Sequence, residues 1–264
     1  MAVMHVTFAS ESLKRWTDCV VIVPMEKGAN PDSVIPEKFP TLYLLHGYTG
    51  NCMDWCTGSD IRAYAEKNRV AVVMPSGENS FYLDDEQADI RYAGLIAELV
   101  AFTRKMFPLS EKREDTFIGG LSMGGFGALR NGFFYSHLFG KVIGLSGAYI
   151  QDSLANMGPE GNGVAPRGYY ERVFGDLQAV VGSDKNPLIC AQQAKERGDA
   201  PKVFMACGTE DFLISENRNM AQSLKQLGIE VDYFEGPGVH DWTFWNTWIK
   251  EAFAWLRKSK KEGV

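Results

Sequence analysis

The sequence predicts an α/β fold in which helices flank a mostly parallel central sheet. Short apolar runs recur along the chain, and longer segments with helical spacing lie between them. Strands that alternate with helices are typical of a parallel sheet covered on both faces. The 264 residues are 45% hydrophobic and 12% aromatic, which is enough for the large core of one domain spanning residues 1–264.

The expected strands are short runs of apolar or β-branched residues that end at Gly, Pro or polar residues. Most of these runs are apolar throughout, which favours strands that are buried on both faces. In chain order they are Val20–Val23, Thr41–Leu45, Val70–Met74, Thr116–Ile118, Val142–Leu145, Val203–Ala206 and Glu230–Phe234.

Three of the intervening segments have clear helical periodicity. In Ile90–Phe107 apolar residues recur every three or four positions, and the segment ends before Pro108. The other two are Asn217–Leu227, which Gly228 ends, and Trp242–Leu256.

The segment Tyr149–Ala200 departs from this alternation of strands and helices. Glycines and prolines crowd its first part, and a short helical piece is expected around Leu188–Arg197. A structureless loop of this length would be unusual in a compact domain. We therefore interpret the segment as a cap-like insertion over one end of the sheet, beside the active site; a surface excursion without function is the alternative.

The composition argues against several classes of protein function. With 27 Lys and Arg against 33 Asp and Glu, the chain has a net charge of −6 and lacks the basic surplus of a nucleic-acid binder. No apolar run approaches the roughly 18 to 20 residues of a membrane span. The start of the chain lacks the order of a secretory signal, and five scattered cysteines do not form a disulfide framework. These features predict a cytoplasmic enzyme.

The motif Gly120-Leu121-Ser122-Met123-Gly124 carries the chemistry. It follows a short apolar strand and precedes a helix-compatible segment, as the G-x-S-x-G motif of a serine nucleophile requires. A tight turn from strand to helix strains the serine backbone and leaves no room for side chains two residues away. The alternative is a glycine-rich turn in which Ser122 caps a helix.

A serine nucleophile needs a base, and the chain has only four histidines. His5 precedes the sheet core, and His137 lies too far along the helix that leaves Ser122. His46 ends a strand in a loop that it is expected to brace. His240 lies in a Gly- and Pro-rich loop after the last strand and is therefore the predicted general base.

The acid that orients the base should follow a strand and precede the histidine in the chain. Asp211 and Glu210 both lie just past the strand Val203–Ala206, and we favour Asp211 because the apolar residues after it would anchor the loop. Asp241 is adjacent to His240 and is expected to cap the last helix instead.

An acyl-transfer site also needs donors for an oxyanion. The amide of Met123, directly after the nucleophile, is one candidate. The second is expected from the loop after Thr41–Leu45, where Gly47 allows the backbone to turn inward. The amide of Tyr48 is favoured there, with that of Gly47 as the alternative.

These segments resemble an esterase family of the α/β-hydrolases that includes tributyrin, feruloyl and acetyl esterases and S-formylglutathione hydrolases. The resemblance extends from Val20 to Leu256. The motifs that carry it are Leu44–Asn51, Gly120–Gly125, Cys207–Leu213 and His240–Trp242.

The resemblance implies an α/β-hydrolase fold and assigns the same roles to Ser122, Asp211 and His240 and to the Tyr48 and Met123 amides. It also implies that Phe81, Tyr82 and the cap line the substrate pocket.

The expected activity is hydrolysis of short-chain acyl or hydroxycinnamoyl (feruloyl-type) esters through an acyl-serine intermediate. Hydrolysis of S-formylglutathione, deacetylation of plant polysaccharide fragments and a catalytically silent binding module are the alternatives. We expect a small-molecule ester as partner, and no cofactor, nucleic acid or membrane; the oligomeric state, including a homo-oligomer, stays open. Cys52 and Cys56 have a spacing that could bind a metal, but without further Cys or His nearby in the sequence free thiols are expected.

Overall fold

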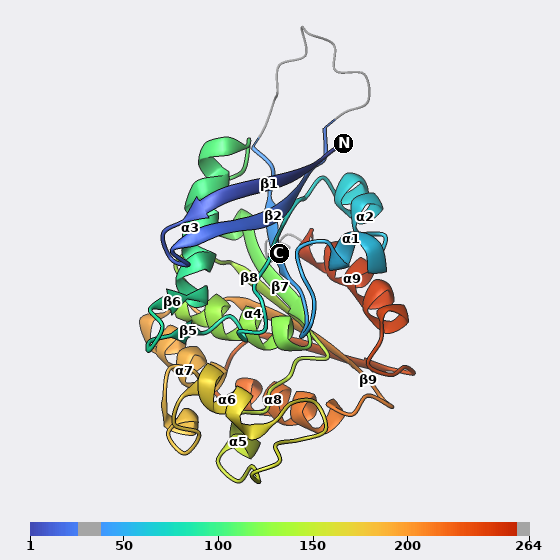
Figure 1. The fold of residues 1–264 in the computed structure, drawn as a ribbon. Coiled ribbons are helices and arrows are strands. Elements are labelled where there is room, and N and C mark those ends of the chain that lie inside the picture. Colours follow the sequence, from blue (N-terminus) through green and yellow to red (C-terminus); the bar gives the residue numbers. More distant parts are fainter. Residues whose placement is uncertain (26–37, 258–264) are drawn as a thin grey trace, which may run out of the picture.

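The computed structural model describes residues 1–25 and 38–257. An eight-stranded sheet forms its centre, with the strand order β1-β2-β4-β3-β7-β8-β9-β10 (Figure 1). The six strands from β4 to β10 are parallel, whereas β1 and β2 pair antiparallel to each other and β2 pairs antiparallel to β4. The strands are β1 Ala2–Ser10, β2 Arg15–Val23, β3 Thr41–Leu45, β4 Ala71–Pro75, β7 Thr116–Leu121, β8 Lys141–Leu145, β9 Lys202–Gly208 and β10 Val231–Gly236.

Helices cover both faces of the sheet (Figure 1). Alternate residues of the buried strands point to opposite faces, so that Tyr43 and Leu45 join one apolar cluster and Leu42 and Leu44 join the other. Helices α1, α2 and α9 contribute to the second cluster, and α3, α4, α7 and α8 to the first. The helices are α1 Asp54–Gly58, α2 Ile61–Asn68, α3 Tyr92–Met106, α4 Met123–Phe134, α5 Gln151–Leu154, α6 Arg167–Phe174, α7 Pro187–Arg197, α8 Ile214–Gln226 and α9 Trp242–Leu256.

The expected α/β architecture is confirmed, and each of the seven expected strands overlaps a strand of the sheet. The helix expected over Ile90–Phe107 begins two residues late, because Ile90–Arg91 forms β6, which pairs with β5 (Asp84–Asp85). The sequence analysis did not identify β1. This strand lies at the edge of the sheet and alternates between partly buried and exposed residues, so it lacks the continuous apolar run used to find the others.

Half of the segment 149–200 is helical. Helices α5 and α6 lie beyond the carboxyl ends of the parallel strands, whereas α7 packs beside α4 in one helical layer (Figure 1). Two short 3₁₀ turns complete the elements, Arg113–Asp115 outside this segment and Val180–Gly182 within it. The helical piece expected around Leu188–Arg197 is therefore α7, and it belongs to the core rather than to the insertion above the site.

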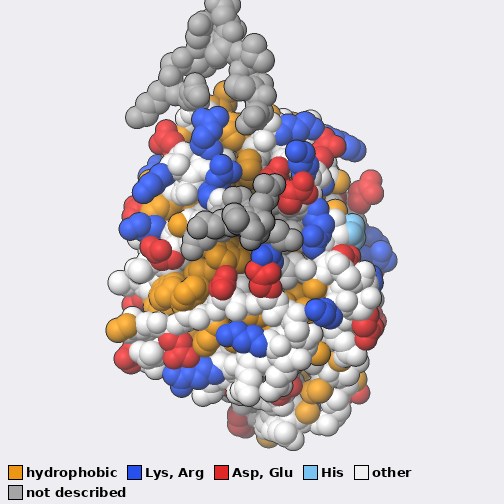
Figure 2. Space-filling model, turned by 180° about the vertical axis from the view of Figure 1, so that it is seen from behind, with side chains coloured by type: hydrophobic (Ala, Val, Ile, Leu, Met, Phe, Trp, Pro, Cys, Tyr) orange, Lys and Arg blue, Asp and Glu red, His pale blue; other side chains and the backbone are white. Residues whose placement is uncertain are grey.

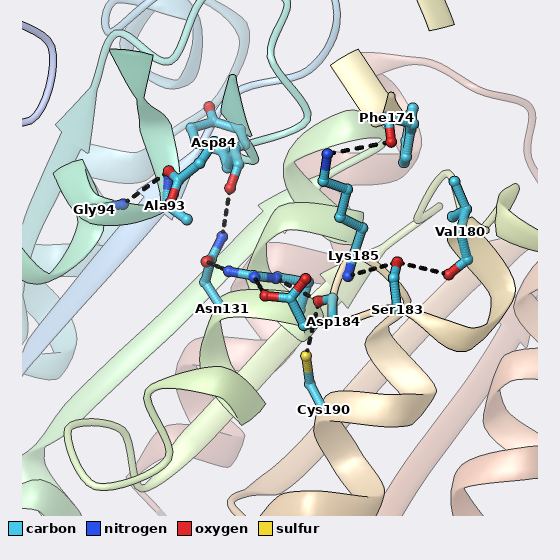
Figure 3. Close-up of polar contacts among 12 residues, drawn as sticks. Asp84, Ala93, Gly94, Asn131, Phe174, Val180, Ser183, Asp184, Lys185 and Cys190 are labelled. Carbon is cyan, nitrogen blue, oxygen red and sulfur yellow. Dashed lines mark hydrogen bonds and ion pairs between the residues drawn. The ribbon is translucent and has the colours of Figure 1, made fainter. Parts of the chain in front are cut away.

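Buried Arg130 on α4 ties the insertion to the core. Its guanidinium donates to the carbonyl of Asp184 at 2.9 Å, to the carboxylate of Asp184 at 2.7 Å and to Asn131 Oδ1 at 2.9 Å. Figure 3 shows Asp184 between Asn131 and Cys190, whose thiol donates to the same carbonyl at 3.1 Å. The loop before α7 is thus held by three donors from two helices.

On the face seen from behind, Lys and Arg side chains lie interspersed with Asp and Glu (Figure 2). Among residues 1–25 and 38–257, no helix has the length and apolarity that crossing a membrane requires.

Candidate active site

The candidate site lies at the carboxyl edge of the parallel sheet. Ser122 directly follows β7, Asp211 follows β9, and His240 follows β10. Parallel strands bring their carboxyl ends to one edge, so three residues far apart in the chain meet there.

Ser122 occupies a strained bend between β7 and α4, with φ 52° and ψ −120°. The glycines of the motif make the bend possible. A Cβ on Gly120 would collide with the backbone of Gly124, and a Cβ on Gly124 would lie 2.5 Å from the carbonyl oxygen of His46. The bend leaves the Ser122 side chain beside the cavity at the sheet edge and places it at the amino end of α4.

His240 bridges Ser122 and Asp211. Its Nε2 lies 2.9 Å from Ser122 Oγ, and its Nδ1 lies 2.9 Å and 3.1 Å from the two carboxylate oxygens of Asp211. With Nδ1 protonated by this pairing, Nε2 is the acceptor that faces the serine hydroxyl. The structure thus brings together the three side chains that the sequence predicted.

Asp211 is kept ionised although its side chain is fully buried. Burial raises the pKa of Asp211, but hydrogen bonds from His240, from the Leu213 amide at 2.9 Å and from Ser146 outweigh this effect. The pKa of Asp211 therefore lies below its ordinary value. An ionised carboxylate at this position stabilises a protonated imidazole.

Glu210, the alternative acid, points elsewhere. Its carboxylate accepts hydrogen bonds from the Gly238 amide at 2.7 Å and from the Thr209 hydroxyl at 2.8 Å. The bond from the Gly238 amide is the main reason why the pKa of this exposed carboxyl is lowered. Glu210 holds the loop that carries His240, and Asp211 pairs with the imidazole.

The loop after β3 lies against the nucleophile. A Cβ on Gly47 would be 3.6 Å from Ser122 Cβ, and Tyr48 and Met123 line the same cavity as Ser122. The amide of Met123 is the first of α4 and so has no partner within the helix.

His46 braces this loop, as the sequence analysis expected. Its Nδ1 donates to the Gly47 carbonyl at 2.7 Å, and its Nε2 accepts from the Gly77 amide at 2.8 Å. Burial lowers the pKa of His46, which fits a ring that accepts a hydrogen bond only when neutral.

A small cavity of about 60 Å³ adjoins Ser122. Its lining is mainly aromatic and aliphatic and includes residues of the insertion, as expected. The lining residues are Tyr48, Phe81, Ser122, Met123, Ala148, Ile150, Asn162, Val164, Tyr169, Tyr170, Phe212 and Leu213.

Phe81 is a pocket residue, but the expectation for Tyr82 was wrong. Tyr82 is completely buried, and its hydroxyl exchanges hydrogen bonds with the backbone of His46, accepting from the amide at 3.0 Å and donating to the carbonyl at 3.2 Å. Both residues have positive φ, 52° and 55°. This unusual backbone turns the two neighbouring rings to different surroundings, one to the cavity and one beneath the loop.

Two further residues at the site had no signal in the sequence. The Trp245 indole donates to Ser146 Oγ at 3.1 Å, and the Ser146 hydroxyl contributes to the lowered pKa of Asp211. Asp241 behaves as expected and caps α9, accepting from the Phe244 amide at 3.0 Å. His5 lies on β1, where its Nε2 is 3.9 Å from Asp18 and 4.0 Å from Cys52 Sγ.

The fold and the site define an α/β-hydrolase with a paired hydroxyl, imidazole and carboxylate. Residues 29–256 match the model of the Esterase family, described as "Putative esterase". The chain belongs to this family and is a carboxylic ester hydrolase.

Relatives cover almost the whole chain. An acetyl esterase of Caldicellulosiruptor saccharolyticus is 48% identical, with 98% of this chain and 99% of that protein covered. The fluorophosphonate-binding serine hydrolase F of Staphylococcus aureus is 28% identical with a TM-score of 0.86, covering 98% of this chain and 99% of the other. The S-formylglutathione hydrolase of the same organism is 28% identical with a TM-score of 0.84, covering 97% and 98%.

Proposed function

We propose that the protein is a serine esterase that removes acetyl groups, with Ser122 as nucleophile, His240 as general base and Asp211 as the orienting acid. The observation that carries this proposal is the 2.9 Å contact of His240 Nε2 with Ser122 Oγ, together with the paired contact of His240 Nδ1 with Asp211.

The reaction follows from these contacts. Ser122 Oγ attacks the acyl carbon while its proton passes to His240 Nε2. The amides of Tyr48 and Met123 donate to the oxyanion, with Gly47 as the residue that shapes this loop. The bond to the alcohol breaks as His240 returns the proton to the leaving oxygen. Water then gives a proton to His240 and attacks the acyl carbon. The bond between this carbon and Ser122 Oγ breaks as His240 returns the proton to Oγ, which releases the carboxylic acid.

The size of the cavity supports a small acyl group. The cavity beside Ser122 measures about 60 Å³, whereas an apolar cavity that holds a benzene ring measures about 150 Å³. A space of this size favours an acetyl group over the ring of a hydroxycinnamoyl group. The acetyl esterase that is 48% identical supports the same choice.

Hydrolysis of S-formylglutathione is the second candidate. A formyl group is smaller still, and one structural neighbour with 28% identity carries that name. The two candidates differ in the part of the substrate that leaves, an alcohol in one case and glutathione in the other.

A substrate panel with a Ser122→Ala control tests the proposal. We expect p-nitrophenyl acetate to be hydrolysed with a higher kcat/KM than the butyrate, and the octanoate, methyl ferulate and S-formylglutathione to be poor substrates. Ser122→Ala should lower kcat by at least about 10³-fold. Near-normal hydrolysis by Ser122→Ala would remove the proposed nucleophile, and a preference for S-formylglutathione would favour the second candidate.

We also propose that residues 1–264 form one domain, that the part of 149–200 before α7 acts as a cap, and that the protein works in the cytoplasm. The wall that Ile150, Tyr169 and Tyr170 provide supports the cap. All five cysteines are free, which fits a reducing compartment.

A further inference from the structure

A second cavity, here called the side cavity, lies beside the active-site cavity at Ser122. It has a volume of about 380 Å³, and residues of α6, of the loop after β4 and of the β5–β6 hairpin form most of its lining. Among the described residues, Tyr169 on α6 is the one residue that lines both cavities. Its side chain therefore forms a wall between them.

The contacts of Tyr169 place its side chain across this wall. Its hydroxyl donates at 2.9 Å to the carbonyl of Asn79, a residue that lines the side cavity. Its ring lies against two residues that line the active-site cavity, with centroid distances of 5.2 Å to Tyr48 and 6.5 Å to Phe81. One side chain thus contacts residues of both cavities.

The wall is also fixed to the loop that carries Tyr48. Asn79 Oδ1 accepts a hydrogen bond from the Thr49 amide at 2.7 Å, while the carbonyl of the same residue accepts from Tyr169. The buried ring of Tyr170 packs edge-on against Tyr169, with 5.0 Å between the centroids. Burial raises the pKa of Tyr169, so its hydroxyl stays protonated and able to donate. These contacts hold the ring in the closed position.

The side cavity offers apolar surface to a longer acyl chain. Leu83 in its lining is 2% exposed, and Val173 packs against the apolar core. Arg15 and Glu78 also line the cavity, but their side chains are half exposed and pair with each other at 2.5 Å. An acyl chain that reached this space could cover apolar side chains, which is favourable.

We propose that Tyr169 limits the length of the acyl chain by closing the active-site cavity towards the side cavity. This inference rests on the proposed function, because it takes the cavity at Ser122 to hold the acyl group. With the ring in place, the acyl group has about 60 Å³. Without the ring, that space would join the cavity of about 380 Å³ and admit a chain such as octanoyl.

Hydrolysis of p-nitrophenyl acetate and octanoate by Tyr169→Ala tests the wall. We expect the ratio of kcat/KM for octanoate over acetate to rise at least about tenfold, since one methylene in a hydrophobic pocket already changes selectivity by about 10- to 200-fold. Tyr169→Phe keeps the ring and removes only the hydroxyl, so its ratio should stay near that of the wild type. Tyr169→Leu, a second variant with a shorter apolar side chain, should also raise the ratio.

A second substitution tests where the longer chain lies. Val173 lines the side cavity but not the active-site cavity. In the wild type, Val173→Phe should leave the ratio unchanged, because Tyr169 already separates the cavities. In Tyr169→Ala, the same change should remove most of the gain with octanoate and leave acetate hydrolysis in place. This coupling between two residues of one cavity is what a double-mutant cycle measures.

The outcomes separate this inference from the proposed function. If Tyr169→Ala and Tyr169→Leu hydrolyse acetate with an unchanged ratio, the wall is refuted while the proposed esterase stands. A gain that Val173→Phe does not reduce would also overturn the inference, because the longer chain would then lie outside the side cavity. An equal gain in Tyr169→Phe would do the same, because the ring would not be the barrier. Failure of the proposed function would appear instead as ester hydrolysis by Ser122→Ala.

Discussion

The indole of Trp245 stands edge-on against the imidazole of His240, with 4.9 Å between the ring centroids and 90° between the planes. The same indole donates to Ser146, whose hydroxyl contributes to the lowered pKa of Asp211. One side chain therefore contacts the proposed base directly and supports the proposed acid through a hydroxyl. Neither Trp245 nor Ser146 lines the cavity beside Ser122, so both residues act on His240 from behind the site.

Removing the Ser146 hydroxyl should lower kcat without changing KM. Ser146→Ala deprives Asp211 of one hydrogen bond, and hydrogen bonds to charged groups contribute about 1.5–3 kcal/mol. We therefore expect kcat for p-nitrophenyl acetate to fall roughly 10- to 100-fold, with KM retained because Ser146 lies outside the cavity lining. Trp245→Phe keeps an aromatic ring against His240 and should have a smaller effect. An unaltered kcat in Ser146→Ala would contradict this role.

Neutralising Asp211 should lower kcat far more than neutralising Glu210. Asp211→Asn removes the charge beside the imidazole and can reverse its tautomer, which costs about 10⁴-fold in kcat in serine proteases. Glu210→Gln keeps an oxygen that can accept from Gly238, so kcat should stay within about threefold of the wild type. Steady-state kinetics of both variants decide the assignment, and the reverse order of losses would identify Glu210 as the acid.

Stability should decrease as the pH falls below about 6.5, in part because of His46. Burial lowers the pKa of His46 in the folded protein, whereas the unfolded chain takes up a proton near pH 6.5. The unfolded state then binds more protons, so the contribution is full above pH 6.5 and is lost as the pH falls towards the folded-state pKa. Urea unfolding of the wild type and of His46→Gln at pH 7.5 and 5.5 measures it. The variant should lose part of the pH dependence, and an identical slope would refute this account.

The wall of the active-site cavity should set the length of the acyl chain. Ile150 lines the cavity, and Ile150→Ala removes enough volume for longer acyl groups. One methylene in a hydrophobic pocket changes selectivity by about 10- to 200-fold. The ratio of kcat/KM for p-nitrophenyl butyrate over acetate should therefore rise about tenfold or more. Val181→Ala, exposed in the same insertion and absent from the lining, is the control and should leave the ratio unchanged.

Replacing Arg130 should destabilise the insertion more than it lowers the catalytic rate. Arg130→Met keeps the length of the buried side chain but removes the two hydrogen bonds that Arg130 donates to the carbonyl and carboxylate of Asp184, leaving only the thiol of Cys190 as a donor to that carbonyl. We expect a loss of about 1–3 kcal/mol in the free energy of unfolding. Limited proteolysis should cut faster in the loop before α7, the region around Asp184 in Figure 3. Wild-type cleavage rates would show that α4 does not anchor this loop.

The strands and the proposed triad could be predicted because their signals are local. A buried parallel strand is a continuous apolar run, and the bend at Ser122 needs glycines at fixed positions. The expected order of nucleophile, acid and base along the chain then limited the residues that could pair with Ser122 to Asp211, its neighbour Glu210, and His240. By contrast, β1 is an edge strand in which only every second residue turns inward, as at Met4, Val6 and Phe8. Its alternation was present in the sequence but gives a weaker signal.

The remaining details depend on tertiary contacts that leave no local pattern. Phe81 and Tyr82 are adjacent buried aromatic residues with nearly the same positive φ, and only their tertiary contacts distinguish the ring that lines the cavity from the ring that bonds to the His46 backbone. Ser146 and Trp245 are 99 positions apart and meet because α9 packs near the end of β8. The insertion could be located by its glycines and prolines, whereas its packing beside α8 could not.

The positive φ of Ser122 lowers the stability of the fold at the residue on which the proposed catalysis depends. A glycine at position 122 would adopt φ 52° with little strain, and a non-glycine residue held in a sparsely populated region costs about 1–3 kcal/mol. The residue proposed to perform catalysis is thus also one that weakens the folded chain. Screens that select heat-resistant variants without assaying hydrolysis will enrich inactive proteins at this position.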